Sequence, residues 1–167
     1  WGKIAVINSV NVEVSGNEVA GYRGMSGCSQ NDSYGCAGGD GVGIRVQDCI
    51  SCSVEENEVY AIHGGLGGSS NIHGGPGGHG IGILISQGMN PLVSGNEIWD
   101  IYGGDGGGHA QFQLDGVRGN AVGIQLTSTQ VASLHARGPD DAGHTNVPPG
   151  RLNKLVTEVV NLDAGDI

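Results

Sequence analysis

The chain repeats itself with a period of about 40 residues, and this periodicity constrains its fold more than any other feature. The blocks VSGNEV, VEENEV and VSGNEI recur in successive repeats, each preceded by a shorter apolar block. A repeat of this length is a unit that buries its apolar residues only by stacking on its neighbours. The repeats begin at Gly2, Val42, Ile81 and Val122, so successive starts differ by 40, 39 and 41 in the numbering.

Each full period contains a constant part of fixed length, at positions 2–23, 42–63 and 81–102, and a glycine-rich insert that carries all the variation in length. The inserts span residues 24–41, 64–80 and 103–121 and hold 22 of the 34 glycines. Glycine doublets let extended backbones approach closely, as in bundles of polyproline II segments. We therefore expect the inserts to project from one side of the stack as arms that pack on each other.

The constant part alternates β-branched and polar residues, which predicts three short, half-buried strands in each unit. Stacking equivalent strands in register, about 4.8 Å apart, would align their aliphatic side chains into one continuous interior. Two of the resulting rows are Ile4, Ile44, Ile83 and Ile124, and Val14, Val54, Val93 and Leu134.

Over residues 1–137, with its short GIGI-type strands and recurring asparagine, the chain resembles the right-handed parallel β-helix family of surface proteins, pectin-degrading enzymes and carbohydrate-binding domains. The resemblance implies an all-β fold, a short right-handed parallel β-helix solenoid of about four coils with glycine-rich loop insertions and a C-terminal strand or cap. A β-propeller is the alternative fold, although the constant part is too short for a four-stranded blade.

The composition changes after residue 137, and residues 138–167 form a polar linker followed by an apolar segment. This segment predicts a strand over residues 155–162 that caps the stack or adds to the first coil of another copy. Head-to-tail addition of copies would produce a filament. The residues that we expect to cover the ends or to mediate assembly are Trp1, Leu155, Val159 and Val160.

Asn17, Asn57 and Asn96 occupy equivalent positions, where an asparagine can adopt a left-handed conformation at a corner while its amide bonds the asparagines above and below. This pattern is similar to the asparagine ladder of β-helices. Arg137 takes the equivalent position in the fourth repeat, so we expect the regular stacking to end there.

Tyr60 and Trp99 also share a position, between inward aliphatic residues, so both rings should face outward and lie one above the other. Exposed aromatic rings suit the faces of sugars, which makes this pair a candidate glycan-binding site. The alternative is that a glycine-rich insert folds over the two rings and covers them.

Two sets of polar side chains are candidates for metal sites. The outward glutamates at equivalent positions form either a cation-binding strip or a solvated face that discourages aggregation; they are Glu18, Glu58 and Glu97. The histidines of the arms lack tight ligand spacing, so we predict no metal and no other cofactor; they are His63, His73, His79 and His109.

The four cysteines favour two short-range disulfides, Cys28–Cys36 in the first insert and Cys49–Cys52 at a corner of the second repeat. A redox Cys-x-x-Cys motif and a four-cysteine zinc site are the alternatives, but the strand-to-helix context and the regular spacing that they need are missing. Disulfides indicate an exported protein in an oxidising environment, so we expect it outside the cell or on its surface.

The net charge of −10, from 17 acidic and 7 basic residues, argues against nucleic-acid binding. No apolar run is long enough for a membrane span, and the chain opens at Trp1, which suggests a processed chain.

Three functions follow from the sequence. The first is a non-catalytic extracellular scaffold that self-assembles with copies of itself, and the second is a glycan-binding module. The third, less favoured, is a polysaccharide lyase or hydrolase that would use Arg45, Asp48 and Glu55.

Overall fold

A computed structural model describes residues 2–30, 34–108, 115–127, 133–134 and 151–156. Within these residues the protein is all-β, with parallel strands in three sheets and no helix. The predicted Trp1, Val159, Val160, His109 and Arg137 lie outside the described residues.

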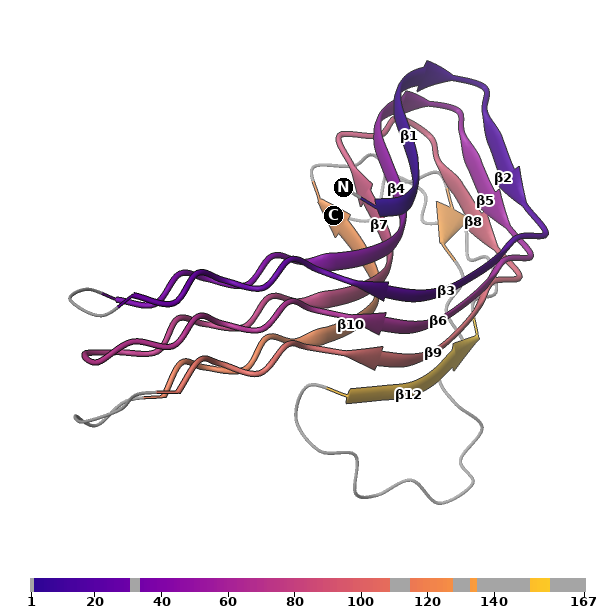
Figure 1. Cartoon of the computed structure of the whole chain (residues 1–167). Coiled ribbons are helices and arrows are strands. Elements are labelled where there is room, and N and C mark those ends of the chain that lie inside the picture. Colours follow the sequence, from indigo (N-terminus) through magenta and orange to yellow (C-terminus); the bar gives the residue numbers. More distant parts are fainter. Residues whose placement is uncertain (1, 31–33, 109–114, 128–132, 135–150, 157–167) are drawn as a thin grey trace, which may run out of the picture.

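Each of the first three repeats contributes one strand to each sheet (Figure 1). The first sheet has the order β1 (Gly2–Val10), β4 (Gly41–Ile50), β7 (Gly80–Ser86) and β10 (Ala121–Thr127). The second sheet has the order β11 (Ser133–Leu134), β8 (Leu92–Ser94), β5 (Ser53–Glu55) and β2 (Glu13–Ser15). The third has the order β12 (Arg151–Val156), β9 (Glu97–Tyr102), β6 (Glu58–His63) and β3 (Glu18–Arg23).

The strand register confirms the repeat boundaries derived from the sequence. The repeat starts Gly2, Val42, Ile81 and Val122 are successive parallel partners, and Ile4, Ile44, Ile83 and Ile124 pair in the same way. Identical apolar positions therefore lie over one another across four repeats.

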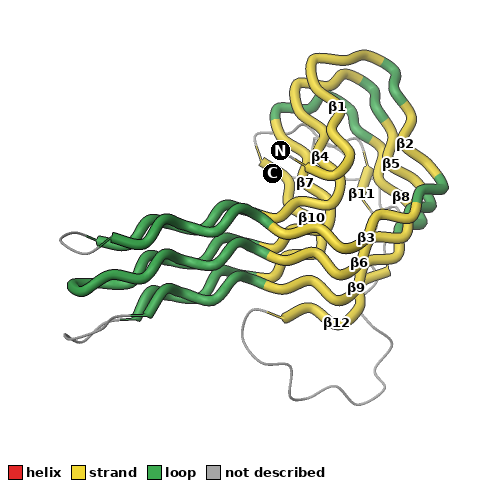
Figure 2. The backbone as a smooth tube through the Cα atoms, in the orientation of Figure 1, coloured by secondary structure: helices red, strands yellow, loops and turns green. Residues whose placement is uncertain are grey.

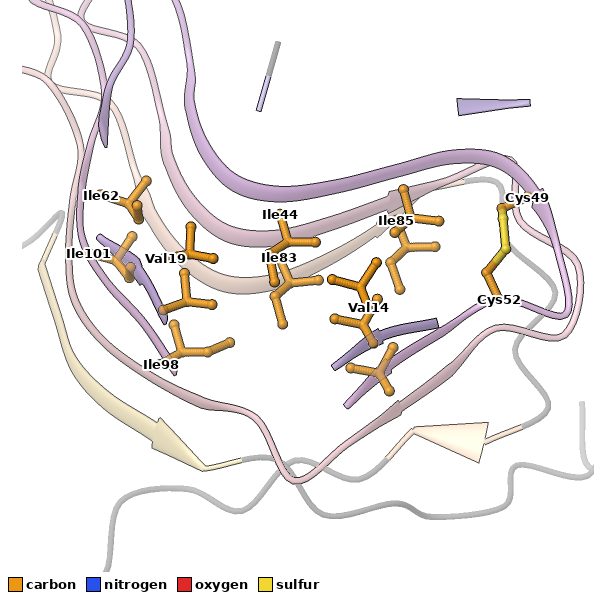
Figure 3. Close-up of a cluster of buried hydrophobic side chains, with 14 residues drawn as sticks. Val14, Val19, Ile44, Cys49, Cys52, Ile62, Ile83, Ile85, Ile98 and Ile101 are labelled. Atoms are coloured by element: carbon orange, nitrogen blue, oxygen red, sulfur yellow. A yellow bond between two sulfur atoms is a disulfide. The ribbon is translucent and has the colours of Figure 1, made fainter. Parts of the chain in front are cut away.

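The inward side chains form one apolar core between the three sheets (Figure 3). The Cys49–Cys52 disulfide lies at one end of this core, and Ile62 and Ile101 lie at the other. Ile44, Ile83, Ile62 and Ile101 are fully buried, so aliphatic side chains supply most of the buried area that stabilises the stack.

Each repeat turns at residues with positive φ that occupy equivalent positions in successive repeats. One such position precedes the ladder asparagines and holds Gly16 (φ 62°), Glu56 (φ 53°) and Gly95 (φ 62°). Asn17, Asn57 and Asn96 do not have positive φ, so the predicted left-handed asparagine is wrong. The preceding residue makes the turn, which leaves the asparagine side chain directed inward for hydrogen bonding.

The glycine-rich inserts leave the sheets as arms that lie side by side (Figures 1 and 2). Each arm has an outgoing segment (24–30, 64–70 or 103–108) and a returning segment (34–40, 73–79 or 115–120). Neighbouring outgoing segments are joined every third residue, as in Gly24 N–H to His63 O (2.9 Å) and Gly27 N–H to Leu66 O (2.7 Å). This three-residue period is that of polyproline II helices, so the expected packing of the arms on one another is confirmed.

The C-terminal strand β12 differs from its expected position. It spans Arg151–Val156, so it begins before the expected start at residue 155, and it pairs antiparallel with β9 of the same chain. Residues 157–162 of the expected strand lie outside the described residues. Leu152 pairs with Ile101 and Leu155 with Ile98, so the three-residue spacing of the leucines matches that of the isoleucines.

Candidate functional site

The outward face of the third sheet carries a row of aligned side chains at one position of β3, β6 and β9. Ala20 pairs with Tyr60, and Tyr60 pairs with Trp99. The Tyr60 and Trp99 rings are stacked, with centroids 4.7 Å apart and planes 6° from parallel, and both are half-buried. The predicted outward stacking of this pair is confirmed, and we call Ala20, Tyr60 and Trp99 the aromatic row.

Each ring of this pair uses one face to contact the other. A parallel stack at this distance leaves the ring edges toward solvent and only the outer face of each ring for a ligand. The outer face of Tyr60 is turned toward β3, and that of Trp99 toward β12. The stacked geometry therefore leaves each ring with one face that the other ring does not cover.

A second stacked pair lies where the third sheet passes into the arms. The His63 and Tyr102 rings have centroids 4.7 Å apart and planes at 11°, and Arg23 is the register partner of His63 on β3. Burial and the nearby Arg23 guanidinium lower the pKa of His63, while Asp100 acts in the opposite direction. His63 is therefore held in its neutral form, which suits a stacked ring.

Charged groups surround the aromatic row. The Tyr60 hydroxyl donates a hydrogen bond to Glu18 Oε1, and the Lys3 ammonium donates one to the Ala20 carbonyl. The hydrogen bond to Glu18, together with desolvation and the Glu18 and Glu58 carboxylates, raises the pKa of Tyr60. Glu18, Glu58 and Glu97 pair in register and are exposed, as the sequence predicted.

The arms do not fold over the aromatic row. Their described segments extend away from the third sheet (Figures 1 and 2), so the expectation that an insert covers Tyr60 and Trp99 is wrong. The physical reason is that the inserts satisfy their backbone hydrogen bonds with one another. The described arm segments therefore leave the aromatic row uncovered.

The pattern of glycines shows that the bundle of arms is finite. The segment 64–70 has neighbours on two sides and carries doublets, because a Cβ on Gly65 or Gly68 would overlap the carbonyl oxygens of Met25 and Cys28. The equivalent positions in the first outgoing segment are Met25 and Cys28 themselves, which face no further segment. Their side chains would obstruct another segment that packed there in the same way.

The opposite border of the bundle is closed by the same means. The third returning segment has Asp115 and Arg118 where the second has Gly74 and Gly77. Arg118 forms an ion pair with Asp105 of its own arm. A further arm segment therefore cannot pack on either border of the bundle in the way that the arms pack on one another.

The described histidines of the arms contact rings and backbone rather than one another. His73 stacks on Tyr34 (centroids 5.1 Å apart), and His79 Nδ1 accepts a hydrogen bond from the Asn120 N–H (2.9 Å). In the described part of the chain, no group of three or more histidine, cysteine, aspartate or glutamate side chains is arranged to hold a metal ion.

The candidate catalytic residues lie on two different sheets. Arg45 donates to Gln47 (2.7 Å), and Gln47 donates to Asp48 (3.1 Å), all on β4 of the first sheet. Glu55 lies on β5 of the second sheet and accepts a hydrogen bond from Ser94 (3.2 Å). The structure thus gives Arg45 and Asp48 a shared hydrogen-bond chain that does not include Glu55.

The asparagine ladder and both favoured disulfides are present. The Asn17 side-chain amide donates to Asn57 Oδ1, and that of Asn57 donates to Asn96 Oδ1, each across 2.9 Å. Cys28 is bonded to Cys36 across the first arm, and Cys49 to Cys52 at the corner between the first two sheets.

Two ring pairs are not predicted from the sequence. His63 is a candidate only for metal binding there, although the alignment that pairs Tyr60 with Trp99 also pairs His63 with Tyr102. Tyr34 and His73 are separated by one repeat period, but they lie in inserts of unequal length. Both pairs could have been predicted by applying the offset of one repeat period to every ring-bearing residue, including those in the inserts.

Comparison with protein-family models, with curated proteins and with solved structures gives no match to this chain. Among the described residues, none belongs to a helix with the length and apolar character of a membrane span.

Proposed function

We propose that this protein is a non-catalytic surface scaffold that binds glycans through the aromatic row. The observation that carries the proposal is the Tyr60–Trp99 pair, stacked and half-exposed on an outward sheet face that the arms leave open. Aromatic rings beside hydrogen-bonding side chains suit sugars, which present apolar C–H faces and hydroxyl groups together. Glu18 and Arg23 are such side chains on β3.

The scaffold in this proposal is a short right-handed parallel β-helix. Its support is that each of the first three repeats places one strand in each of the three sheets and that the asparagines form a continuous ladder. The stack holds the aromatic row on a rigid sheet, which lowers the entropic cost of ordering a binding site.

We place this scaffold outside the cell or on its surface. The support is the pair of disulfides, which persist in oxidising compartments. The hydrogen-bond chain of Arg45 and Asp48 does not include Glu55, which favours binding over polysaccharide cleavage.

The test is a glycan array probed with the whole chain and with Tyr60→Ala and Trp99→Ala. Retention of a defined glycan class by the parent chain, lost in both variants, supports the proposal. Tyr34→Ala is the matched control, since Tyr34 is an exposed tyrosine stacked on His73 in the arms, and it should bind as the parent does. A parent chain that retains no glycan overturns the proposal.

Head-to-tail assembly is a second candidate, favoured by one observation. The strands β1, β2 and β3 each stand at one end of their sheets in the described chain, which leaves three aligned edges for strand addition. Because Met25 and Cys28 obstruct the first border of the arms, copies would join through these edges with their arms out of line. Light scattering over a range of concentrations tests this, and a constant monomer mass would exclude it.

A further inference from the structure

The aromatic row lacks a ring at its first position. Tyr60 and Trp99 are stacked on adjacent strands, but their partner on β3 is Ala20, whose side chain is a methyl group. One face of Tyr60 contacts Trp99, and the other is turned toward Ala20. Neighbouring strands are about 4.8 Å apart, close to the separation at which flat rings stack. A ring-sized ligand can therefore occupy the place that a third aromatic side chain would fill.

Polar groups border this position on several sides. Glu18 accepts the hydrogen bond of the Tyr60 hydroxyl at one edge of the ring, and the Lys3 ammonium contacts the Ala20 carbonyl. Arg23, on the same strand as Ala20, is exposed and lies beside His63 in the register. These groups offer both acceptors and donors to the hydroxyls of a ring placed on Tyr60.

The three carboxylates near this position outnumber the cations Lys3 and Arg23, which favours a neutral ligand. Glu18, Glu58 and Glu97 form an exposed row next to the aromatic row, and the whole chain has a net charge of −10. An acidic sugar would approach this carboxylate row at an electrostatic cost, whereas a neutral sugar would not.

We propose that the outer face of Tyr60 at Ala20 is the sugar-binding position, and that it takes a single neutral pyranose ring. This inference rests on the proposed glycan binding and specifies the ring face and the ligand class. The sugar stacks on Tyr60 as a third member of the row, and its hydroxyls bond Glu18 and Arg23. The remaining faces of the Tyr60–Trp99 pair take no part in sugar stacking.

The test fills the position beside Tyr60 with a side chain of the protein itself. Ala20→Tyr supplies the missing ring, which would stack on Tyr60 and exclude the ligand without removing any contact of the parent chain. Methyl β-glucoside, methyl β-galactoside and methyl α-mannoside serve as neutral probes, and methyl glucuronoside as the acidic one. Binding is measured by two-dimensional NMR on the whole chain, from the shifts of the backbone amides of Tyr60 and of residue 20, alanine in the parent chain and tyrosine in the variant.

We expect at least one neutral probe to bind the parent chain and to bind Ala20→Tyr at least about tenfold more weakly. Ala37→Tyr, which adds the same ring to an exposed position on a returning arm segment, should bind as the parent does. If Ala20→Tyr fails to fold, Ala20→Val reduces the space with less perturbation, and Glu18→Gln tests the polar contact.

The outcomes separate the two proposals. If no probe and no array glycan binds the parent chain, the proposed function fails. If a neutral probe binds the parent chain and Ala20→Tyr equally, glycan binding stands and the Ala20 position is wrong. Preference for methyl glucuronoside would overturn the neutral class.

Discussion

The side-chain amide of Asn57 donates a hydrogen bond to Oδ1 of Asn96 across 2.9 Å, in the buried interior between successive repeats. The same amide also bonds the carbonyls of Val14 (2.8 Å) and Glu55 (3.0 Å). Asn57 thus connects three repeats, and its polar atoms are satisfied only while the repeats keep their register.

Replacing this asparagine should therefore destabilise the whole stack. Asn57→Ala leaves several buried backbone and side-chain groups without partners, which should lower the free energy of unfolding by roughly 2–5 kcal/mol. Asn17→Ala is the matched control, because Asn17 is half-exposed at the start of the ladder and should cost about 1 kcal/mol. Urea unfolding measures both, and equal losses would argue against a buried ladder.

The arms should be sensitive to a single methyl group at inward positions. A Cβ on Gly67 would overlap the Gly75 carbonyl oxygen, so Gly67→Ala should separate the second arm's two segments at a cost of at least about 3 kcal/mol. Ser69→Ala changes an exposed position two residues away and should stay within about 0.5 kcal/mol. NMR line widths and amide shifts of residues 64–80 distinguish the two variants, and an unchanged Gly67→Ala spectrum would contradict the packing.

The disulfide of the first arm should act locally. Cys28 and Cys36 join the outgoing and returning segments, where the Cys36 N–H also donates to the Cys28 carbonyl (3.0 Å). The double variant Cys28→Ser, Cys36→Ser should lose about 2 kcal/mol at most and should free this N–H to exchange with solvent. The buried residues of β4 and β7 should keep their exchange rates, and faster exchange there would mean that the disulfide supports the core.

The neutral state of His63 should give the stability a pH dependence. Burial and the Arg23 guanidinium hold the pKa of His63 in the folded chain below the usual value of about 6.5. Between the folded-state pKa and the unfolded-state pKa, the unfolded chain therefore binds protons more readily than the folded chain. The stability that His63 contributes is complete above the unfolded-state pKa and is lost as pH falls through the folded-state pKa. His63→Phe keeps a ring against Tyr102 and removes the titration, so its Tm should fall less between about pH 7.5 and about pH 5. An identical fall in both proteins would rule out this contribution.

The sequence alone predicts the repeat, the strand register and the residues that align in each row of the stack, because stacking places equivalent residues in contact. Ile44 and Ile83 are register partners for the same reason that Asn57 bonds Asn96 and Tyr60 stacks on Trp99. The disulfide pairing followed from the short separations within one insert and one corner.

Features that depend on local backbone geometry could not be predicted from the repeat. The left-handed residue at the ladder corner is Glu56 rather than Asn57, although asparagine has the stronger preference for that conformation. The reason is that the Asn57 side chain forms hydrogen bonds with other repeats. The antiparallel pairing of Leu155 with Ile98 depends on a strand that belongs to no repeat, so periodicity gave no information about it.

The most direct test of the account is backbone amide hydrogen exchange in the second arm, measured by NMR. Gly64, Gly65, Gly67 and Gly68 each donate their N–H to a carbonyl of another repeat across 2.8 Å, whereas the Leu66 N–H has no backbone acceptor in the described chain. The account predicts slow exchange at these four glycines and fast exchange at Leu66. Uniformly fast exchange over residues 64–68 would mean that the repeats do not stack through their arms, and it would contradict the account.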